Sequence, residues 1–169
     1  HWRINGPEGR AVASLVYDGN RLFVPCGYPS RRIWAVRPDG RGDVTDTHVE
    51  WRLKQACPYV PSPVVVNGYF LMVADNGVAS CYDATTGAQH WVERIGRRYS
   101  SSIVNVGDLV YFLSDDGDTK VVRAGKTFDL VAENAIGEPC YASPAISRGQ
   151  IFIRGERHLF CLGDQSKPQ

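Results

Sequence analysis

The stretch Asp83-Ala84-Thr85-Thr86-Gly87-Ala88-Gln89-His90-Trp91 decides the fold. Its first five residues have the composition of a tight turn. An Asp can hydrogen-bond to its own backbone, two hydroxyl side chains follow, and the Gly can adopt positive φ. Strand-forming residues flank the turn at 78–82 and 91–95. The stretch therefore predicts a strand–turn–strand corner that ends in a large aromatic residue, Trp91.

This corner recurs along the chain at a period near forty residues. Trp2, Trp51 and Trp91 each open a short strand, and Leu130 is expected to take the same position a fourth time, at spacings of 49, 40 and 39 residues. A second marker keeps the same register, a Gly within a tight hairpin: Gly19, Gly68, Gly107 and Gly149. Repeats of this length that contain only strand patterns indicate propeller blades.

The repeats make up a single domain. They cover about residues 13–58, 59–98, 99–140 and 141–169, and a further short strand at residues 1–5 precedes the first repeat. No segment has the apolar periodicity of a helix. The predicted fold class is all-β, a β-propeller of four-stranded antiparallel blades with about four repeats.

The strand at residues 1–4 and the last repeat are complementary, because the last repeat lacks an outer strand. In closed propellers the N-terminal strand often completes the last blade and so removes two unpaired edges. We therefore expect residues 1–4 to pair beside residues 158–162, within one chain or across two. Two interpretations stay open: a propeller of four blades that closes alone, or the C-terminal part of a larger propeller whose upstream blade owns this strand.

The composition excludes several classes of protein. Hydrophobic residues make up 43% and charged residues 22%, as in ordinary globular domains, and a net charge of +1 gives no reason to expect nucleic acid as a partner. No apolar run approaches the roughly 20 residues that span a membrane. Five Cys without a CxxC pair fit neither a closed disulfide framework nor a zinc site. Cys81 and Cys161 occupy one repeat position, which is expected to be a small buried core site.

The motif AxDxxTGxxxW at the corner resembles the repeat signature of the PQQ-like, or quinoprotein-dehydrogenase-like, β-propellers. Asp83, Thr86, Gly87 and Trp91 match it, and Cys81 stands at its small position. The first and third repeats match more loosely. The resemblance implies that each Trp packs between adjacent blades and that the protein is bacterial, either periplasmic or secreted. The family contains both pyrroloquinoline quinone dehydrogenases that use calcium and cofactor-free scaffolds.

Two functions follow from this resemblance. The first is a non-catalytic scaffold or binding module that takes a protein or a small-molecule ligand at the propeller face, with self-association to close the ring. The alternative is a fragment of a dehydrogenase that uses pyrroloquinoline quinone with calcium. The sequence has no adjacent Cys pair of the kind such enzymes place over the quinone, and no calcium-ligand set can be assigned by motif. We therefore expect no cofactor and assign no catalytic residue.

Two groups of residues are candidates for binding. Aromatic and Arg side chains are common in binding surfaces, and seven of them are expected on one rim of the channel: Tyr59, Tyr99, Tyr141, Arg31, Arg32, Arg97 and Arg98. The alternative is that the Tyr rings only pack the top of the channel. In the enlarged corner of the first repeat, Asp39, Asp43 and Asp46 have the oxygen ligands that calcium prefers. That corner lacks a terminal bidentate Glu, so a solvated loop is the expected structure.

Overall fold

The computed structural model describes residues 1–163, and all regular secondary structure in this part of the chain is β-strand. The strands form four antiparallel sheets in chain order, which we call blades 1 to 4, and one short two-stranded pair. Blade 1 contains β2 (Val16–Tyr17), β3 (Leu22–Cys26), β4 (Arg32–Val36) and β6 (Val49–Leu53). Blade 2 contains β7 (Val64–Val66), β8 (Tyr69–Val73), β9 (Val78–Asp83) and β10 (Gln89–Arg94). Blade 3 contains β11 (Val104–Val106), β12 (Leu109–Leu113), β13 (Asp118–Arg123) and β14 (Asp129–Ala135). Blade 4 has three strands, β15 (Ala145–Ser147), β16 (Gln150–Arg154) and β17 (Leu159–Gly163).

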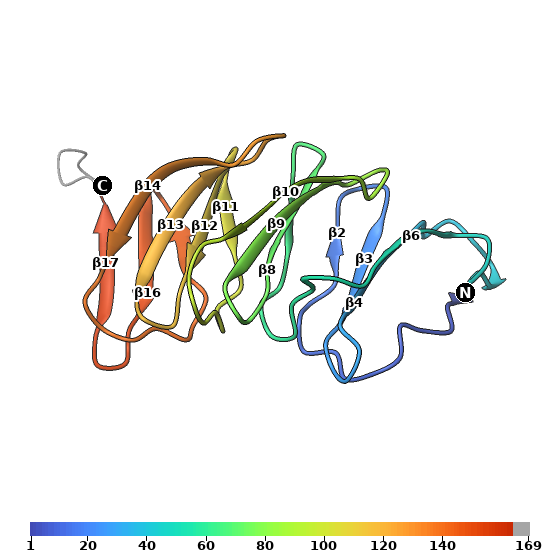
Figure 1. The fold of residues 1–169 in the computed structure, drawn as a ribbon, viewed down its shortest axis with the longest axis horizontal. Helices are drawn as coiled ribbons and strands as arrows, with labels where there is room; N and C mark the ends of the chain where they lie inside the picture. Colours follow the sequence, from blue (N-terminus) through green and yellow to red (C-terminus); the bar gives the residue numbers. More distant parts are fainter. Residues whose placement is uncertain (164–169) are drawn as a thin grey trace.

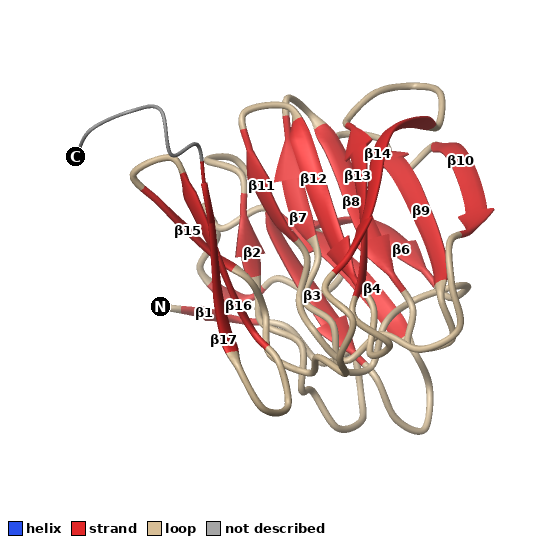
Figure 2. Cartoon of the chain, turned by 90° about the vertical axis from the view of Figure 1, so that its left-hand side faces the viewer, coloured by secondary structure: helices blue, strands red, loops and turns tan. Residues whose placement is uncertain are grey.

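The blades stand side by side in the order of the chain, with the two termini at opposite ends of the row (Figure 1). Viewed along the row, the first strands of the blades gather on one side, and the outer strands β6, β10 and β14 lie on the other (Figure 2). The first strands β2, β7 and β11 contact one another in sequence. This arrangement is that of propeller blades around a central axis, so the predicted all-β fold class is confirmed.

Tight two-residue turns join the first and second strands of blades 2, 3 and 4, and residues 18–21 join those of blade 1. In blade 2 Val66 pairs with Tyr69, and the two residues between them, Asn67 and Gly68, have φ values of 50° and 81°. Positive φ at both central residues is typical of a type I′ turn, whose twist matches the twist of the paired strands. The hairpin Gly markers of the sequence therefore mark true turns.

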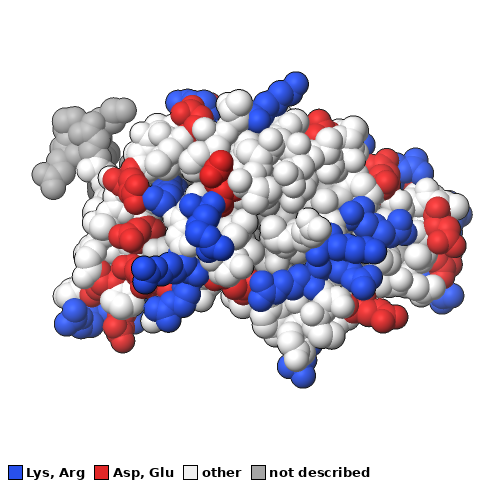
Figure 3. Space-filling model, viewed as in Figure 1, with Lys and Arg blue, Asp and Glu red and all other residues white. Residues whose placement is uncertain are grey.

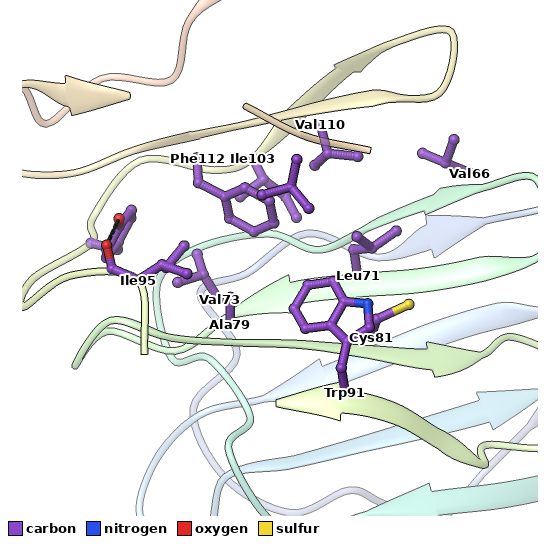
Figure 4. Close-up of a cluster of buried hydrophobic side chains, with 12 residues drawn as sticks. Val66, Leu71, Val73, Ala79, Cys81, Trp91, Ile95, Ile103, Val110 and Phe112 are labelled. Atoms are coloured by element: carbon purple, nitrogen blue, oxygen red, sulfur yellow. Dashed lines mark hydrogen bonds between the residues drawn. The ribbon is translucent and has the colours of Figure 1, made fainter. Parts of the chain in front are cut away.

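One row of side chains on each blade faces the next blade. In blade 2 Leu71, Cys81 and Trp91 stand side by side on three neighbouring strands. Trp91 projects into a buried cluster together with Cys81 and Leu71 (Figure 4). The equivalent row of blade 1 is Phe23, Ala35 and Trp51. Large aromatic residues thus fill the seams between blades 1 and 2 and between blades 2 and 3.

The fourth Trp-like position was wrongly assigned to Leu130. Val121 is the equivalent of Cys81, and its partner on the outer strand is Ala132 rather than Leu130. The corner of blade 3 is one residue longer than that of blade 2, so counting along the sequence missed the register. Leu130 pairs with Val122 and is 42% exposed. The third row is therefore Tyr111, Val121 and Ala132, which ends in a methyl group instead of an indole.

The N-terminal strand does not complete blade 4 within the chain. β1 (Trp2–Arg3) pairs in parallel with β5 (Gly42–Asp43), which belongs to the enlarged corner of blade 1. The predicted pairing of residues 1–4 beside residues 158–162 of the same chain is therefore wrong, because β1 and β17 lie at opposite ends of the row (Figure 1). The Nε1 of Trp2 donates to the carbonyl of Pro38 at 2.9 Å. Trp51 and Trp91 make the same bond to the corners of blades 2 and 3, so β1 occupies the place of an upstream outer strand.

The repeat position of Cys81 and Cys161, predicted to be buried, is buried in blade 2 and exposed in blade 4. Cys81 is fully buried, and burial raises the pKa of its thiol to about 12. Cys161 pairs with Phe152 at the equivalent position but is exposed, because no blade follows blade 4 in the described residues. The prediction of a buried site at Cys161 is wrong for this reason. Free thiols are found at all five Cys.

Candidate functional site

Two Asp residues on neighbouring blades tie together the loops of the predicted rim. The carboxylate of Asp75 accepts hydrogen bonds from the amides of Tyr59 and Val60, at 2.8 and 3.2 Å, and lies 3.6 Å from Arg31. One blade further, the carboxylate of Asp115 accepts from the amide of Ser100 at 2.7 Å. The rim loops of neighbouring blades are therefore held in fixed positions relative to one another.

Asp115 also joins the loops on either side of blade 3. Its amide donates to the carbonyl of Arg98 at 3.0 Å, and its carbonyl accepts from the amide of Cys140 at 3.1 Å. The segments carrying Arg97, Arg98 and Tyr141 thus meet at one hairpin. The structure brings these three predicted residues to the same rim.

Tyr99 does not belong to an exposed rim. It is 2% exposed, and its hydroxyl donates to the carbonyl of Ile95 at 3.2 Å. Burial raises the pKa of this phenol well above its ordinary value. Tyr141 is not the repeat equivalent of Tyr99. The amide of Tyr99 donates to the carbonyl of Asp75, and in the next repeat the amide of Cys140, not of Tyr141, donates to the carbonyl of Asp115. For Tyr99 the alternative, a ring that packs the interior, is the observed one.

The other predicted rim residues differ in exposure. Tyr141 is 59% exposed, whereas Tyr59 is half-buried and its ring lies 6.4 Å from that of Tyr28. Arg97 and Arg98 are exposed, and Arg98 lies 3.6 Å from Asp116. Arg31 is exposed beside Asp75, and Arg32 is half-buried at the start of β4. The exposed part of this rim therefore consists of Arg31, Arg97, Arg98 and Tyr141.

The charged side chains are unevenly spread over one face of the molecule. Lys and Arg form a band over the half that lies toward the N-terminus, whereas the other half carries charges of both signs interspersed (Figure 3). With a net charge of +1 the two signs nearly balance, so this is a difference between regions rather than a large single-sign field.

A ladder of four Ser residues connects all four blades near their first strands. The amide of Ser14 donates to the hydroxyl of Ser62 at 2.9 Å, that of Ser62 to Ser102 at 3.0 Å, and that of Ser102 to Ser143 at 2.9 Å. The hydroxyls of Ser62, Ser102 and Ser143 each accept a bond from the blade before their own. These side chains hold neighbouring blades together, which gives them a structural role.

The acidic residues of the enlarged corner do not converge as calcium ligands would. Asp39 lies 3.3 Å from His48 and 3.8 Å from Arg37. Asp43 accepts from Asn5 and Thr45, and the bonds from Thr45, more than the nearby Arg3, hold its pKa below the ordinary value. Asp46 is exposed and comes together with neither. In residues 1–163 no three His, Cys, Asp or Glu side chains form a group suited to a metal ion.

The corner of blade 2, residues 83–87, packs against the indole of Trp51 from blade 1. Asp83 accepts from the amides of Thr85 and Thr86 at 2.9 and 2.8 Å, and these bonds lower the pKa of its carboxyl group. Gly87 has φ of 71°, and a Cβ at this position would stand only 2.8 Å from the ring of Trp51. The motif residues Asp83, Thr86, Gly87, Trp51 and Trp91 are thus structural.

A cavity that sequence reasoning missed lies between blades 3 and 4. Its volume is about 530 Å³, and its walls are mainly apolar. Its lining residues are Tyr111, Thr119, Val121, Asn134, Ala135, Ile136, Pro144, Ile151, Ile153, Phe160 and Leu162. The signal in the sequence was the absence of Trp from the third repeat, which the assignment of Leu130 concealed.

Comparison with known proteins supports the fold at low sequence identity. Neither a protein-family profile nor a curated protein matches the chain significantly. Among solved structures, BamB from Moraxella catarrhalis superposes with a TM-score of 0.77 at 12% identity, over 96% of this chain and 49% of that chain. The computationally designed Ika4 protein superposes with a TM-score of 0.74 at 12% identity, over 96% of both chains. A europium-containing methanol dehydrogenase matches with a TM-score of 0.56 at 16% identity, over 76% of this chain and 26% of that chain.

These matches show a shared fold and a difference in length. The chain spans about half the length of BamB and about a quarter of that of the methanol dehydrogenase. A β-propeller fold is therefore established over nearly the whole chain. No helix able to span a membrane occurs in residues 1–163.

Proposed function

Starting from a PQQ-like propeller fold, we propose that this chain is a non-catalytic binding module that contacts a protein partner through its rim. The observation that carries the proposal is the meeting of exposed Arg97, Arg98 and Tyr141 at one hairpin. Exposed Arg and Tyr side chains are typical anchors of protein interfaces. The loops that carry them are fixed by Asp115, so little ordering would be needed on binding.

The rim can be tested by site-specific photocrosslinking in bacterial envelope extract. A photoreactive residue at position 141 should give one discrete crosslinked protein species, and the Arg97→Ala, Arg98→Ala pair should abolish it. The matched control is position 92, where Val92 is 39% exposed on the outer strand of blade 2. Equal crosslinking from both positions, or none from position 141, would contradict the rim proposal.

The competing function is that of a dehydrogenase using pyrroloquinoline quinone and calcium, which the likeness to methanol dehydrogenase favours. The residues present do not fit this cofactor well. The rim carboxylates of Asp75 and Asp115 are engaged with backbone amides, and no set of three acidic or other ligand side chains converges in residues 1–163. Adding the quinone with calcium should produce no saturable change in visible absorbance. Saturable binding with alcohol- or sugar-dependent dye reduction would overturn the binding-module proposal.

A bacterial periplasmic or secreted location is also part of the proposal, on the strength of the resemblance to PQQ-like propellers. Fractionation of cells that produce the full-length protein should recover it outside the cytoplasm. Recovery with the cytoplasmic fraction would contradict this location.

Self-association across two chains is the remaining element of the proposal. β1 stands where an upstream blade would have its outer strand, and blade 4 lacks such a strand in the described residues. Docking blade 4 of one copy onto β1 and blade 1 of another would place β1 beside β17, where blade 4 lacks a strand in the described residues, and would cover the face of Phe152 and Cys161. Light scattering should show a dimer that is lost on deleting residues 1–5 or on Phe152→Lys. A monodisperse monomer at about 100 µM would rule it out.

A further inference from the structure

The seam between blades 3 and 4 repeats the seam between blades 2 and 3 with smaller side chains. Strand pairing makes Tyr111, Val121 and Ala132 the equivalents of Leu71, Cys81 and Trp91. On the facing blade, pairing from the hairpin turn makes Ile153 the equivalent of Phe112. The larger Tyr111 and Val121 recover only part of the volume lost from an indole and a phenyl ring.

The space left by the smaller side chains is part of a larger pocket of about 530 Å³ that opens to solvent. Tyr111, Val121 and Ile153 line it directly, and Ala132 lies beside Val121 on the same face of blade 3. Such a volume falls within the range of pockets that hold small molecules, and mainly apolar walls with few polar groups are typical of them. In the neighbouring seam the position of Ala132 is taken by Trp91, whose indole is buried and packs edge-on against Phe128 at 5.2 Å.

We propose that the seam between blades 3 and 4 is a binding site for a small, flat, fused-ring aromatic molecule of the indole type. The chain itself indicates the chemistry, because indoles fill both equivalent seams, each with its N–H bonded to a carbonyl oxygen of the next blade. A ligand of this shape would restore the contacts that Ala132 and Ile153 leave out. The site is separate from the rim and does not depend on a protein partner there.

One polar group of the cavity wall distinguishes this seam from the filled one. Thr119 stands where blade 2 has Ala79, since both pair with the same position of the second strand. The residue is 7% exposed, and its hydroxyl oxygen has no hydrogen-bond partner among residues 1–163. A buried hydroxyl without a partner is costly, and it is satisfied when a ligand donates to it or accepts from it. Rotation about χ1 exchanges the hydroxyl with the methyl group, so the hydroxyl can turn toward a ligand.

The test uses indole as the probe and variants that fill the cavity from either side. Indole should bind the wild-type chain with a dissociation constant on the order of 0.1–1 mM, measured by calorimetry and by ligand-observed NMR. Ala132→Trp restores the side chain of the other seams and should weaken binding at least about tenfold. Ile153→Phe does the same from blade 4, and it serves if Ala132→Trp does not fold. Leu130→Trp is the matched control, because Leu130 is exposed and faces away from the cavity, and it should leave binding unchanged.

A second comparison tests the hydroxyl group. Thr119→Val keeps the shape of the side chain and should weaken indole about two- to tenfold while leaving naphthalene, which has no N–H, unaffected. The proposal is overturned if indole shows no saturable binding to the wild-type chain up to about 5 mM. It is also overturned if Ala132→Trp and Ile153→Phe both fold and bind indole as the wild type does.

Discussion

Replacement of Trp91 by Ala tests whether the aromatic seams hold the blades together. Trp91 is 7% exposed and belongs to the buried cluster between blades 2 and 3 (Figure 4). A Trp side chain buries about 150–250 Å², which at about 25 cal/mol per Å² corresponds to roughly 4–6 kcal/mol before the remaining methyl group is subtracted. Its hydrogen bond to the carbonyl of Gly125 adds about 1 kcal/mol. Together with the usual range of Trp→Ala changes, this predicts a loss of about 4 kcal/mol.

The assay is denaturant unfolding followed by circular dichroism, with two comparison variants. Trp91→Phe keeps most of the ring and loses the N–H donor, so it should cost about 1–2 kcal/mol. Val92→Ala changes an exposed neighbour on the same strand and should cost less than about 0.5 kcal/mol. Equal losses for Trp91→Ala and Val92→Ala would refute the seam assignment.

The cavity created by Trp91→Ala provides an independent check. Indole added to this variant should recover part of the lost stability, because engineered apolar cavities bind ligands of matching shape. Wild type, whose seam is already filled by Trp91, should gain stability only through binding elsewhere. The same titration on a Trp51→Ala variant should give a similar recovery, since Trp51 fills the equivalent seam.

Three further outcomes follow from local geometry. Gly87→Ala should destabilise the fold by about 1–3 kcal/mol in thermal melts, because φ is positive at Gly87 and the new methyl group would clash with the ring of Trp51. Gly125→Ala is the control and should cost less than about 1 kcal/mol, because the space around Gly125 is open. Burial alone would raise the pKa of Glu138, but hydrogen bonds from the ring and amide of His158 lower it below 4.5. The stability that this ionised carboxyl group contributes is therefore fully present above pH 4.5, its ordinary pKa, and is lost as the pH falls through the lowered pKa. Glu138→Gln should flatten the dependence of the melting temperature on pH in this range. An unchanged slope would contradict the assignment. In thiol labelling at pH 8 the exposed Cys161 should react fast. Cys57 should react only on unfolding, because burial raises the pKa of its thiol to about 12. Equal labelling rates for the two thiols would contradict the burial of Cys57.

Much of the fold could be predicted because the repeat markers are local. The Asp83–Gly87 turn and the hairpin glycines act through their own backbone, so their positions in the sequence are their positions in the structure. The aromatic rows could be predicted from the motif for the same reason. The assignment of Leu130 to the Trp position was wrong because the corner before β14 is longer than that of blade 2. Only the pairing of Val121 with Ala132 shows that Ala132 takes this position.

The binding site was less predictable because exposure depends on neighbouring blades. Tyr59, Tyr99 and Tyr141 look alike in sequence, yet one is half-buried, one is buried and one is exposed. Cys161 has the same repeat position as Cys81 but is exposed, because no following blade covers it among residues 1–163. The cavity between blades 3 and 4 arises from a residue that is absent, and a missing side chain leaves no motif to detect.

The ladder of Ser residues has a direction that bears on how such a chain can change in evolution. Every link runs from an amide of one blade to a hydroxyl of the next, from Ser14 through Ser62 and Ser102 to Ser143. Since each interior blade brings one donor and one acceptor, duplication or deletion of a whole blade leaves every link of the ladder with a partner. Loss of part of a blade has no such remedy, because it removes one half of a link and leaves its partner without a bond. For the hydrogen bonds of this ladder, the unit that can be added or removed without loss is therefore the complete repeat of about forty residues.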